Sequence, residues 1–199
     1  MKWELPILIV AAVVCFLLIR LMNRSKDDES RAAKLMKKYA TLTPENLSAA
    51  PDEELVEAVV CHVLSRAADN RRPNPTKELA DLPRPFTVVY SVWAVCKQLS
   101  RGDYRALTRT ATREMVQPAI DGLPVIGAAQ TAAALSALRE IYENKEDTAA
   151  AETAFHKAVE TECPLSLCVA YIRDHIPQLT GTDEEETPAA LPQETADEG

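Results

Sequence analysis

The chain has 199 residues, of which 47% are hydrophobic, and a formal net charge of -8. This length allows one domain with appendages, and the apolar fraction excludes a chain that is disordered throughout. Seven acids and no base lie between Asp183 and Glu198, so the negative charge belongs to a C-terminal segment rather than to a domain surface. Glycine is scarce, and β-branched residues do not alternate with polar ones. The sequence therefore predicts an all-α protein, a single compact helical domain of five to seven helices behind one N-terminal transmembrane helix.

The first element in chain order is an apolar run over residues 3–22. Twenty helical residues span roughly 30 Å, about the thickness of a bilayer core. A cleaved signal peptide is the alternative. Its basic region would be Lys2 alone, balanced by Glu4, and no small-residue cleavage site follows the run. We therefore expect an uncleaved membrane anchor.

Basic residues around the end of this run indicate its orientation. One base, Lys2, precedes it, whereas seven lie at its end and in the residues that follow: Arg20, Arg24, Lys26, Arg31, Lys34, Lys37 and Lys38. Because lysine and arginine are retained on the cytoplasmic side, we expect a single-pass protein of the cell membrane with its domain in the cytoplasm. In that compartment the thiols are reduced.

The composition divides the chain into four parts. These are a transmembrane anchor (1–24), a charged juxtamembrane stalk (25–50), a helical domain (51–179) and a disordered acidic tail (180–199). The bases of the stalk could lie against anionic headgroups or could cover a solvated helix, and the sequence leaves both open.

Within the domain, proline and glycine mark the expected helix ends. Thr43-Pro44 and Pro51-Asp52 each start a helix, and residues 69–85 form a loop that has room only for a short helical turn. Further helices are expected over 86–99, 104–117, 128–142, 149–159 and 164–177, with Pro118 ending the second of these and Gly102 the first.

The helix over 86–99 is expected to be the centre of the domain. Val88, Val92, Val95 and Leu99 recur at helical spacing, and further apolar residues widen the stripe to most of the circumference. A helix this apolar is buried on several sides. We therefore expect Trp93 to be a core residue rather than a binding residue.

The turn after this helix carries a family resemblance. Residues 97–104 read Lys-Gln-Leu-Ser-Arg-Gly-Asp-Tyr. This segment resembles the central motif of a family of small all-helical bacterial domains of unknown function, some of which are described as DNA mimics that bind a transcription regulator. In that family a buried helix ends in an acid, an apolar residue, two Asn, two Gly and an aromatic residue. Leu99, Gly102 and Tyr104 match this pattern, whereas Gln98 stands in place of the acid and Asp103 in place of the second Gly.

Two further segments resemble the same family. Residues 122–128 are similar to its Ile-Gly-Ala turn before an Ala-rich helix, and residues 170–175 to its closing helix. The resemblance covers about residues 52–179 and implies an all-helical fold. It also marks the turn motif, Gln98, Gly102, Asp103 and Tyr104, as a candidate functional segment.

Catalytic and metal motifs give little signal. The sequence has no nucleophile elbow, no phosphate-binding glycine loop and no His-Glu-x-x-His. A zinc site could draw on Cys61-His62, Cys96, Cys163 and Cys168, but buried core thiols are the commoner outcome for cysteine. We therefore expect no catalytic residue, no metal and no cofactor.

Arginines repeat every four residues after the turn. Arg105, Arg109 and Arg113 would share one face of a helix over 104–117, and Arg101 would lie near its start. Such a stripe could hold phosphate groups or an acidic peptide, and the acidic tail could compete for it. A solvated helix face is the alternative reading.

Three functions remain open at this stage. The first is a membrane-tethered, cytoplasm-facing domain that binds a protein partner or anionic lipid, with no direct contact to nucleic acid. The second is a hydrolase or metal-dependent enzyme whose site has no sequence motif. The third, implied by the resemblance alone, is a DNA-mimic-like regulator. A mimic needs carboxylates spaced like phosphates, yet residues 81–180 hold twelve acids against ten bases.

Overall fold

The computed structural model describes residues 31–68, 74–108 and 110–182. Every regular element in these ranges is a helix, so the all-α prediction is confirmed. None of these helices combines the length and apolar character needed to cross a membrane. The predicted anchor (1–24) and nearly all of the acidic tail (180–199) lie outside the described residues.

The helices follow one another along the chain with short connections. They are α2 (Pro44–Ser48), α3 (Asp52–Ala68), α4 (Pro75–Ala80), α5 (Arg84–Leu99), the 3-10 helix η1 (Tyr104–Thr108), α6 (Thr110–Gly122), α7 (Ala129–Asn144), α8 (Ala149–Glu162), α9 (Pro164–Asp174) and α10 (Ile176–Thr180). Residues 31–38, which precede α2, are also helical. The described residues thus hold more helices than the five to seven predicted, because α4 and α10 are too short for periodicity to reveal and the helix predicted over 104–117 is divided into η1 and α6.

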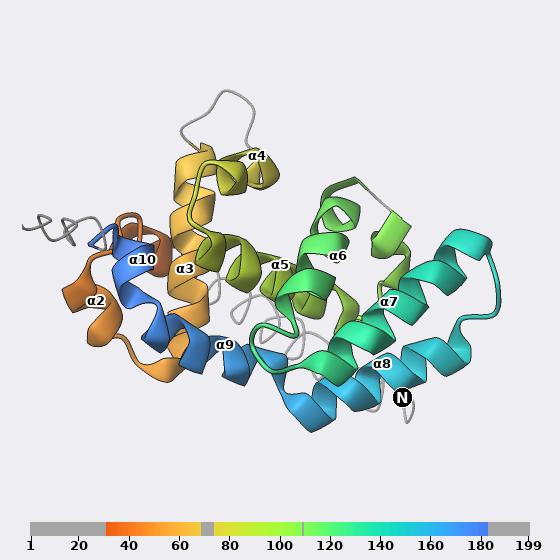
Figure 1. Cartoon of the computed structure of the whole chain (residues 1–199). Coiled ribbons are helices and arrows are strands. Elements are labelled where there is room, and N and C mark those ends of the chain that lie inside the picture. The colour runs from red at the N-terminus through yellow and green to blue at the C-terminus, as the bar shows by residue number, and fades with distance from the viewer. Residues whose placement is uncertain (1–30, 69–73, 109, 183–199) are drawn as a thin grey trace, which may run out of the picture.

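Helix α5 is the centre of the fold, as predicted. It packs against α3, α6 and α9, and also contacts α4, η1 and α10. Figure 1 shows α2, α3 and α10 at one end of the molecule and the α7–α8 hairpin at the other, with α5 between them. Gly122 of α6 lies so close to α5 that an added Cβ would be 3.4 Å from Val88 Cα.

The start of α2 shows how the sequence fixes a helix end. Thr43 Oγ1 accepts a hydrogen bond from Asn46 N at 3.2 Å, and Asn46 Oδ1 accepts one from Thr43 N at 3.0 Å. These reciprocal bonds are a capping box, which confirms the predicted start at Thr43-Pro44.

One predicted helix is wrong in its continuity and in its end. The sequence indicated a single helix over 104–117 ended by Pro118. Instead, η1 covers Tyr104–Thr108, a separate α6 follows, and Pro118 lies inside α6. Proline removes one backbone donor, and the packing of Val116 and Ala119 in the core compensates for that loss.

The charged stalk also differs from the prediction. Leu35, Tyr39, Leu42 and Leu47 are buried in the main core, so residues 31–50 belong to the domain. The helical segment 31–38 lies beside α3, where Tyr39 Oη and Lys38 Nζ donate to Glu54 Oε2 at 2.8 and 2.7 Å. Leu35 and Tyr39 lie four residues apart and share the buried side of this segment, but the many charged residues around them made the segment resemble a solvated stalk.

Candidate functional site

Trp93 lies on a side of α5 that no other helix covers completely. It is half-buried, whereas Val89, Val92 and Val95 on the same helix are at most 1% exposed. The prediction that Trp93 is a core residue rather than a binding residue therefore holds only in part, because the ring packs against the core but is not fully buried. The uncovered side carries Trp93, Ala94 and Lys97, which the broad apolar stripe of the sequence did not separate from the buried sides.

Two grooves meet at Trp93. The first, of about 460 Å³, lies between the segment 31–38, α3 and α5 and is lined by Arg31, Ala32, Leu35, Met36, Glu57, Val60, Cys61, Leu64, Trp93, Lys97 and Arg101. The second, of about 430 Å³, lies between α3, α5 and α9 and is lined by Asp52, Glu53, Val56, Glu57, Trp93, Leu165, Ser166 and Val169. Only Glu57 and Trp93 line both grooves. We call the combined lining the Trp93 surface.

One face of α3 forms the floor of both grooves. Glu53, Val56, Val60 and Leu64 follow the three- and four-residue spacing of a single helix face. From Asp52 to Leu64 the floor is about 18 Å long at 1.5 Å per residue. The surface is therefore long enough to contact about three turns of a helix.

The two ends of the Trp93 surface carry opposite charges. Arg31, Lys97 and Arg101 line the first groove, and Asp52 and Glu53 line the second. At the centre, Arg31 Nη2 lies 3.3 Å from Glu57 Oε2, and the Lys97 ammonium lies 4.8 Å from the centre of the Trp93 ring. A lysine ammonium above an aromatic face is held there by cation–π attraction.

Apolar exposure adds to the second groove. Among the described residues, Leu165 and Val125 are the exposed large hydrophobic residues, at 39% and 43%. Leu165 lies in the second groove, on the first turn of α9, whereas Val125 lies in the connection between α6 and α7. The Trp93 surface thus combines an exposed apolar side chain, a half-buried tryptophan and two charged ends, a composition typical of protein-binding surfaces.

The predicted arginine stripe is not formed by one helix. Arg105 is in η1 and Arg113 in α6, while Arg109 lies between them outside the described residues. The break between η1 and α6 separates residues that a continuous helix would have aligned. Arg101, the fourth predicted binding residue, is exposed and lines the first groove.

The turn motif is ordered by its own side chains. Gln98 Nε2 donates to Asp103 Oδ2 at 3.0 Å across the turn, and Gly102 adopts a φ of 74°, as predicted for the residue that ends α5. Tyr104 is buried, and its hydroxyl is hydrogen-bonded to His156 Nε2. Burial, with the nearby Glu152 and Tyr142, raises the pKa of Tyr104.

The α7–α8 hairpin holds a polar network that the sequence did not reveal. Tyr142 Oη and Thr148 Oγ1 both donate to Glu152 Oε1 at 2.7 Å. At the other end of the hairpin, Glu162 accepts bonds from the backbone N–H groups of Gln130 and Thr131 at 3.0 and 2.7 Å. Because these polar groups are hydrogen-bonded to one another, they join α7, α8 and the connection between the two helices.

The cysteines are not arranged as a metal site. Cys61, Cys96 and Cys168 are buried, and burial raises the pKa of Cys96 and of Cys168 to about 12, in Cys168 with help from Cys96. Cys163 is exposed, and His62 is bound through Nδ1 to the Ala40 carbonyl oxygen at 2.8 Å. Within the described ranges, no three or more His, Cys, Asp or Glu side chains lie where they could hold a metal ion.

Comparison with known proteins adds no relative. No family model, curated protein or solved structure matches the chain.

Proposed function

We propose that this protein is a membrane-tethered, cytoplasm-facing helical domain that binds another protein through the Trp93 surface and has no enzymatic activity. The observation that carries this proposal is the position of Trp93, half-buried at the junction of two grooves with opposite charges. Tryptophan and arginine are the residues most often found at the energetic centre of an interface.

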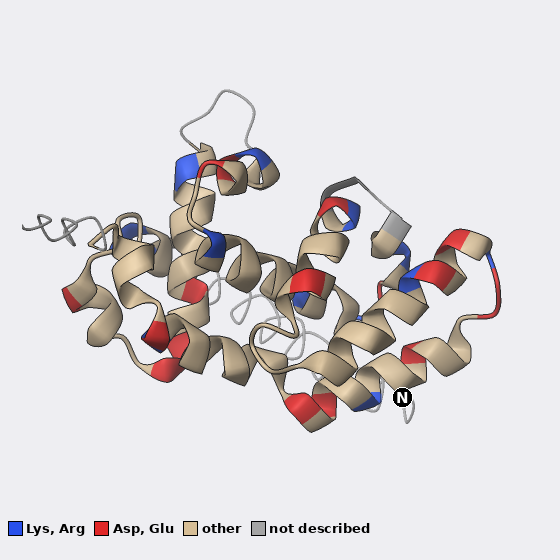
Figure 2. Cartoon of the chain, in the orientation of Figure 1, with Lys and Arg blue, Asp and Glu red and all other residues tan. Residues whose placement is uncertain are grey.

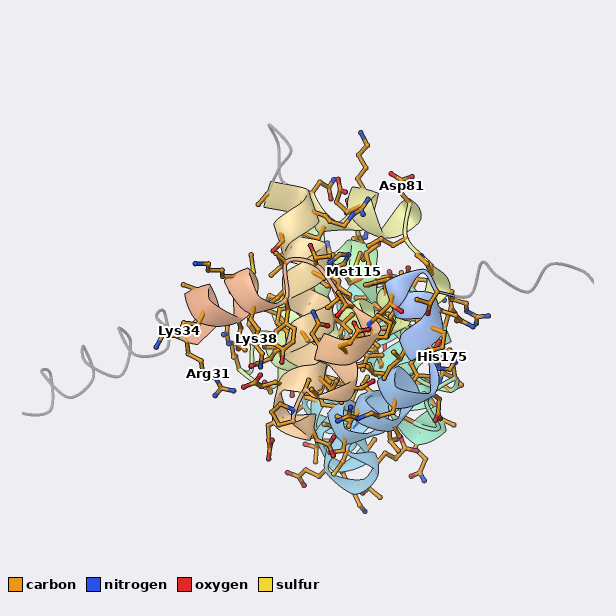
Figure 3. All side chains as sticks on the ribbon, turned by 90° about the vertical axis from the view of Figure 1, so that its left-hand side faces the viewer. Arg31, Lys34, Lys38, Asp81, Met115 and His175 are labelled. Carbon is orange, nitrogen blue, oxygen red and sulfur yellow. The ribbon has the colours of Figure 1, made fainter. Side chains whose placement is uncertain are left out.

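The tether is supported by the apolar run over 3–22 and by the bases around its end. Figure 3 shows the segment 31–38 projecting to one side of α3, with Arg31 and Lys34 at its outer end. These bases are close in the chain to the proposed anchor, so anionic headgroups would attract them by about 1 kcal/mol each. Protease added outside intact cells should leave the domain uncleaved, whereas protease added to inside-out vesicles should remove it.

A DNA-mimic-like regulator, proposed on the resemblance alone, has less support. Figure 2 shows acidic and basic bands interspersed along the helices. Four acids, Asp52, Glu54, Glu57 and Glu78, are paired with bases. Binding of a DNA-binding protein by this domain, competed by duplex DNA, would favour that function.

Site-specific photocrosslinking in native membranes tests the protein-binding function. A photoreactive residue at position 165 should yield protein adducts. A matched probe at position 125 should yield none, because Val125 is as exposed as Leu165 but lines neither groove. Replacing Trp93 by alanine should remove the adducts at position 165. Equal labelling at both positions, or labelling of lipid alone at position 165, would contradict a protein-binding role.

A further inference from the structure

The distribution of charge over the Trp93 surface makes this surface complementary to itself. Its basic end holds Lys97 and Arg101, and its acidic end holds Glu53 and Asp52, of which Asp52 is paired with Arg173 of the same chain. Trp93 lines both grooves. A half-turn about an axis lying in the interface, perpendicular to α3 and passing Trp93, exchanges the two ends. The acidic end of one copy then faces the basic end of the other, as a two-fold interface requires.

We propose that the occupant of the Trp93 surface is a second copy of this chain, so that the protein is a homodimer with antiparallel α3 helices. This inference rests on the proposed function, because it names the partner of the same surface. Glu53 of each copy pairs with Arg101 of the other, twice in each dimer. The two Trp93 side chains meet near the two-fold axis.

Leu165 supplies the apolar contact in this arrangement. It is 39% exposed at the acidic end, and the half-turn brings it to the basic groove of the second copy. That groove is lined by Leu35, Met36 and Leu64, which are apolar, and Met36 has the flexibility to close around an inserted side chain. Burial of Leu165 removes apolar surface from water, while the paired charges fix the register.

Charge reversal at the two ends provides a sharp test. Arg101→Glu places two acids opposite each other at each of the two contacts, and Glu53→Arg places two bases opposite each other there. Each variant alone should dimerise at least about tenfold more weakly than the wild type, because two attractive pairs become repulsive. When the two variants are mixed, both contacts become attractive again, and a heterodimer should form with wild-type strength.

The experiment uses full-length chains carrying two different tags, solubilised in detergent, with association measured by light scattering and by co-capture of the tags. Lys157→Glu and Glu143→Arg are the matched controls, since both residues are exposed and lie on the α7–α8 hairpin. Neither control should change dimerisation. The melting temperature of each variant shows that it is folded, and the rescued mixture shows it independently.

The outcomes separate this inference from the proposed function. A wild-type chain that stays monomeric at all concentrations, or reversed variants that dimerise as well as the wild type, would overturn the homodimer. If the probe at position 165 then captures a different protein, the binding function stands and only the identity of the partner is wrong. If it captures no protein at all, both proposals fail. Formation of the heterodimer from two weakened variants supports both.

Discussion

The α7–α8 hairpin and the Trp93 surface use the same kinds of residue in opposite ways. In the hairpin, Glu152 and Glu162 accept hydrogen bonds within the molecule, and Phe155 between them is 2% exposed. On the Trp93 surface, Glu53, Arg101 and Leu165 are exposed, and the aromatic residue is half-buried. Residue type alone therefore does not distinguish a side chain that stabilises the fold from one that binds a partner. What distinguishes Glu152 and Glu162 from Glu53 is that they accept hydrogen bonds inside the chain while Glu53 is exposed on the surface.

The largest effect on stability is expected in the hairpin. Phe155→Ala removes a buried ring from the core and should lower the free energy of unfolding by about 3–5 kcal/mol. Chemical denaturation of the variant measures this loss. A loss below about 1 kcal/mol would show that the hairpin does not depend on its apolar contacts.

Trp93→Ala should destabilise by about 1–2 kcal/mol less than Phe155→Ala, because part of the ring is already exposed. The same substitution should abolish association through the surface. A stability loss as large as that of Phe155→Ala would place Trp93 in the core and remove the distinction between the two regions.

The contribution of Glu162 to the stability of the hairpin should depend on pH. Partial burial acts to raise the pKa of Glu162, but the hydrogen bonds from Thr131 and Gln130 outweigh it and hold the pKa below its usual 4.5. A carboxyl whose pKa is lowered by folding stabilises the protein above its unfolded pKa, and this contribution is lost as the pH falls through the folded pKa.

Glu162→Gln should therefore cost about 1 kcal/mol near pH 7. The difference from the wild type should shrink as the pH drops below about 4. Denaturation curves at several pH values measure both effects. A difference that stays constant down to pH 3 would mean that the charge of Glu162 does not contribute.

The smallest expected effect on stability is that of Arg101→Glu. Arg101 is exposed, so the free energy of unfolding of the dilute monomer should change by no more than about 0.5 kcal/mol. The variant thus separates folding from association. A large loss of stability in dilute solution would show that Arg101 supports the turn after α5 rather than a contact.

The sequence predicted the fold class and most helix ends because these depend on local signals. The cap at Thr43, the glycine at Gly102 and the apolar spacing of α5 each act within a few residues. The break between η1 and α6, and the continuation of α6 through Pro118, depend on packing against α5. Those features cannot be read from local spacing.

The candidate site was harder to predict for a related reason. Trp93 lies in a stripe that is apolar on almost every side, and only the arrangement of α3, α9 and the segment 31–38 leaves one side open. Arg101 was predicted as a binding residue, but with Arg105, Arg109 and Arg113 rather than with Lys97 and Arg31. Glu53 and Leu165 are distant from it in sequence, so the charge pattern exists only in three dimensions.

The most direct measurement is acrylamide quenching of Trp93 fluorescence in a full-length Trp3→Phe chain, where Trp93 is the remaining tryptophan. In dilute samples the ring should be accessible to the quencher, because the monomer leaves part of it exposed. At high protein concentration quenching should fall as a second copy covers the ring, while the same chain with Arg101→Glu should remain quenchable. Equal quenching of the Trp3→Phe chain at all concentrations, or a ring that is never quenched, would contradict the role assigned to the Trp93 surface.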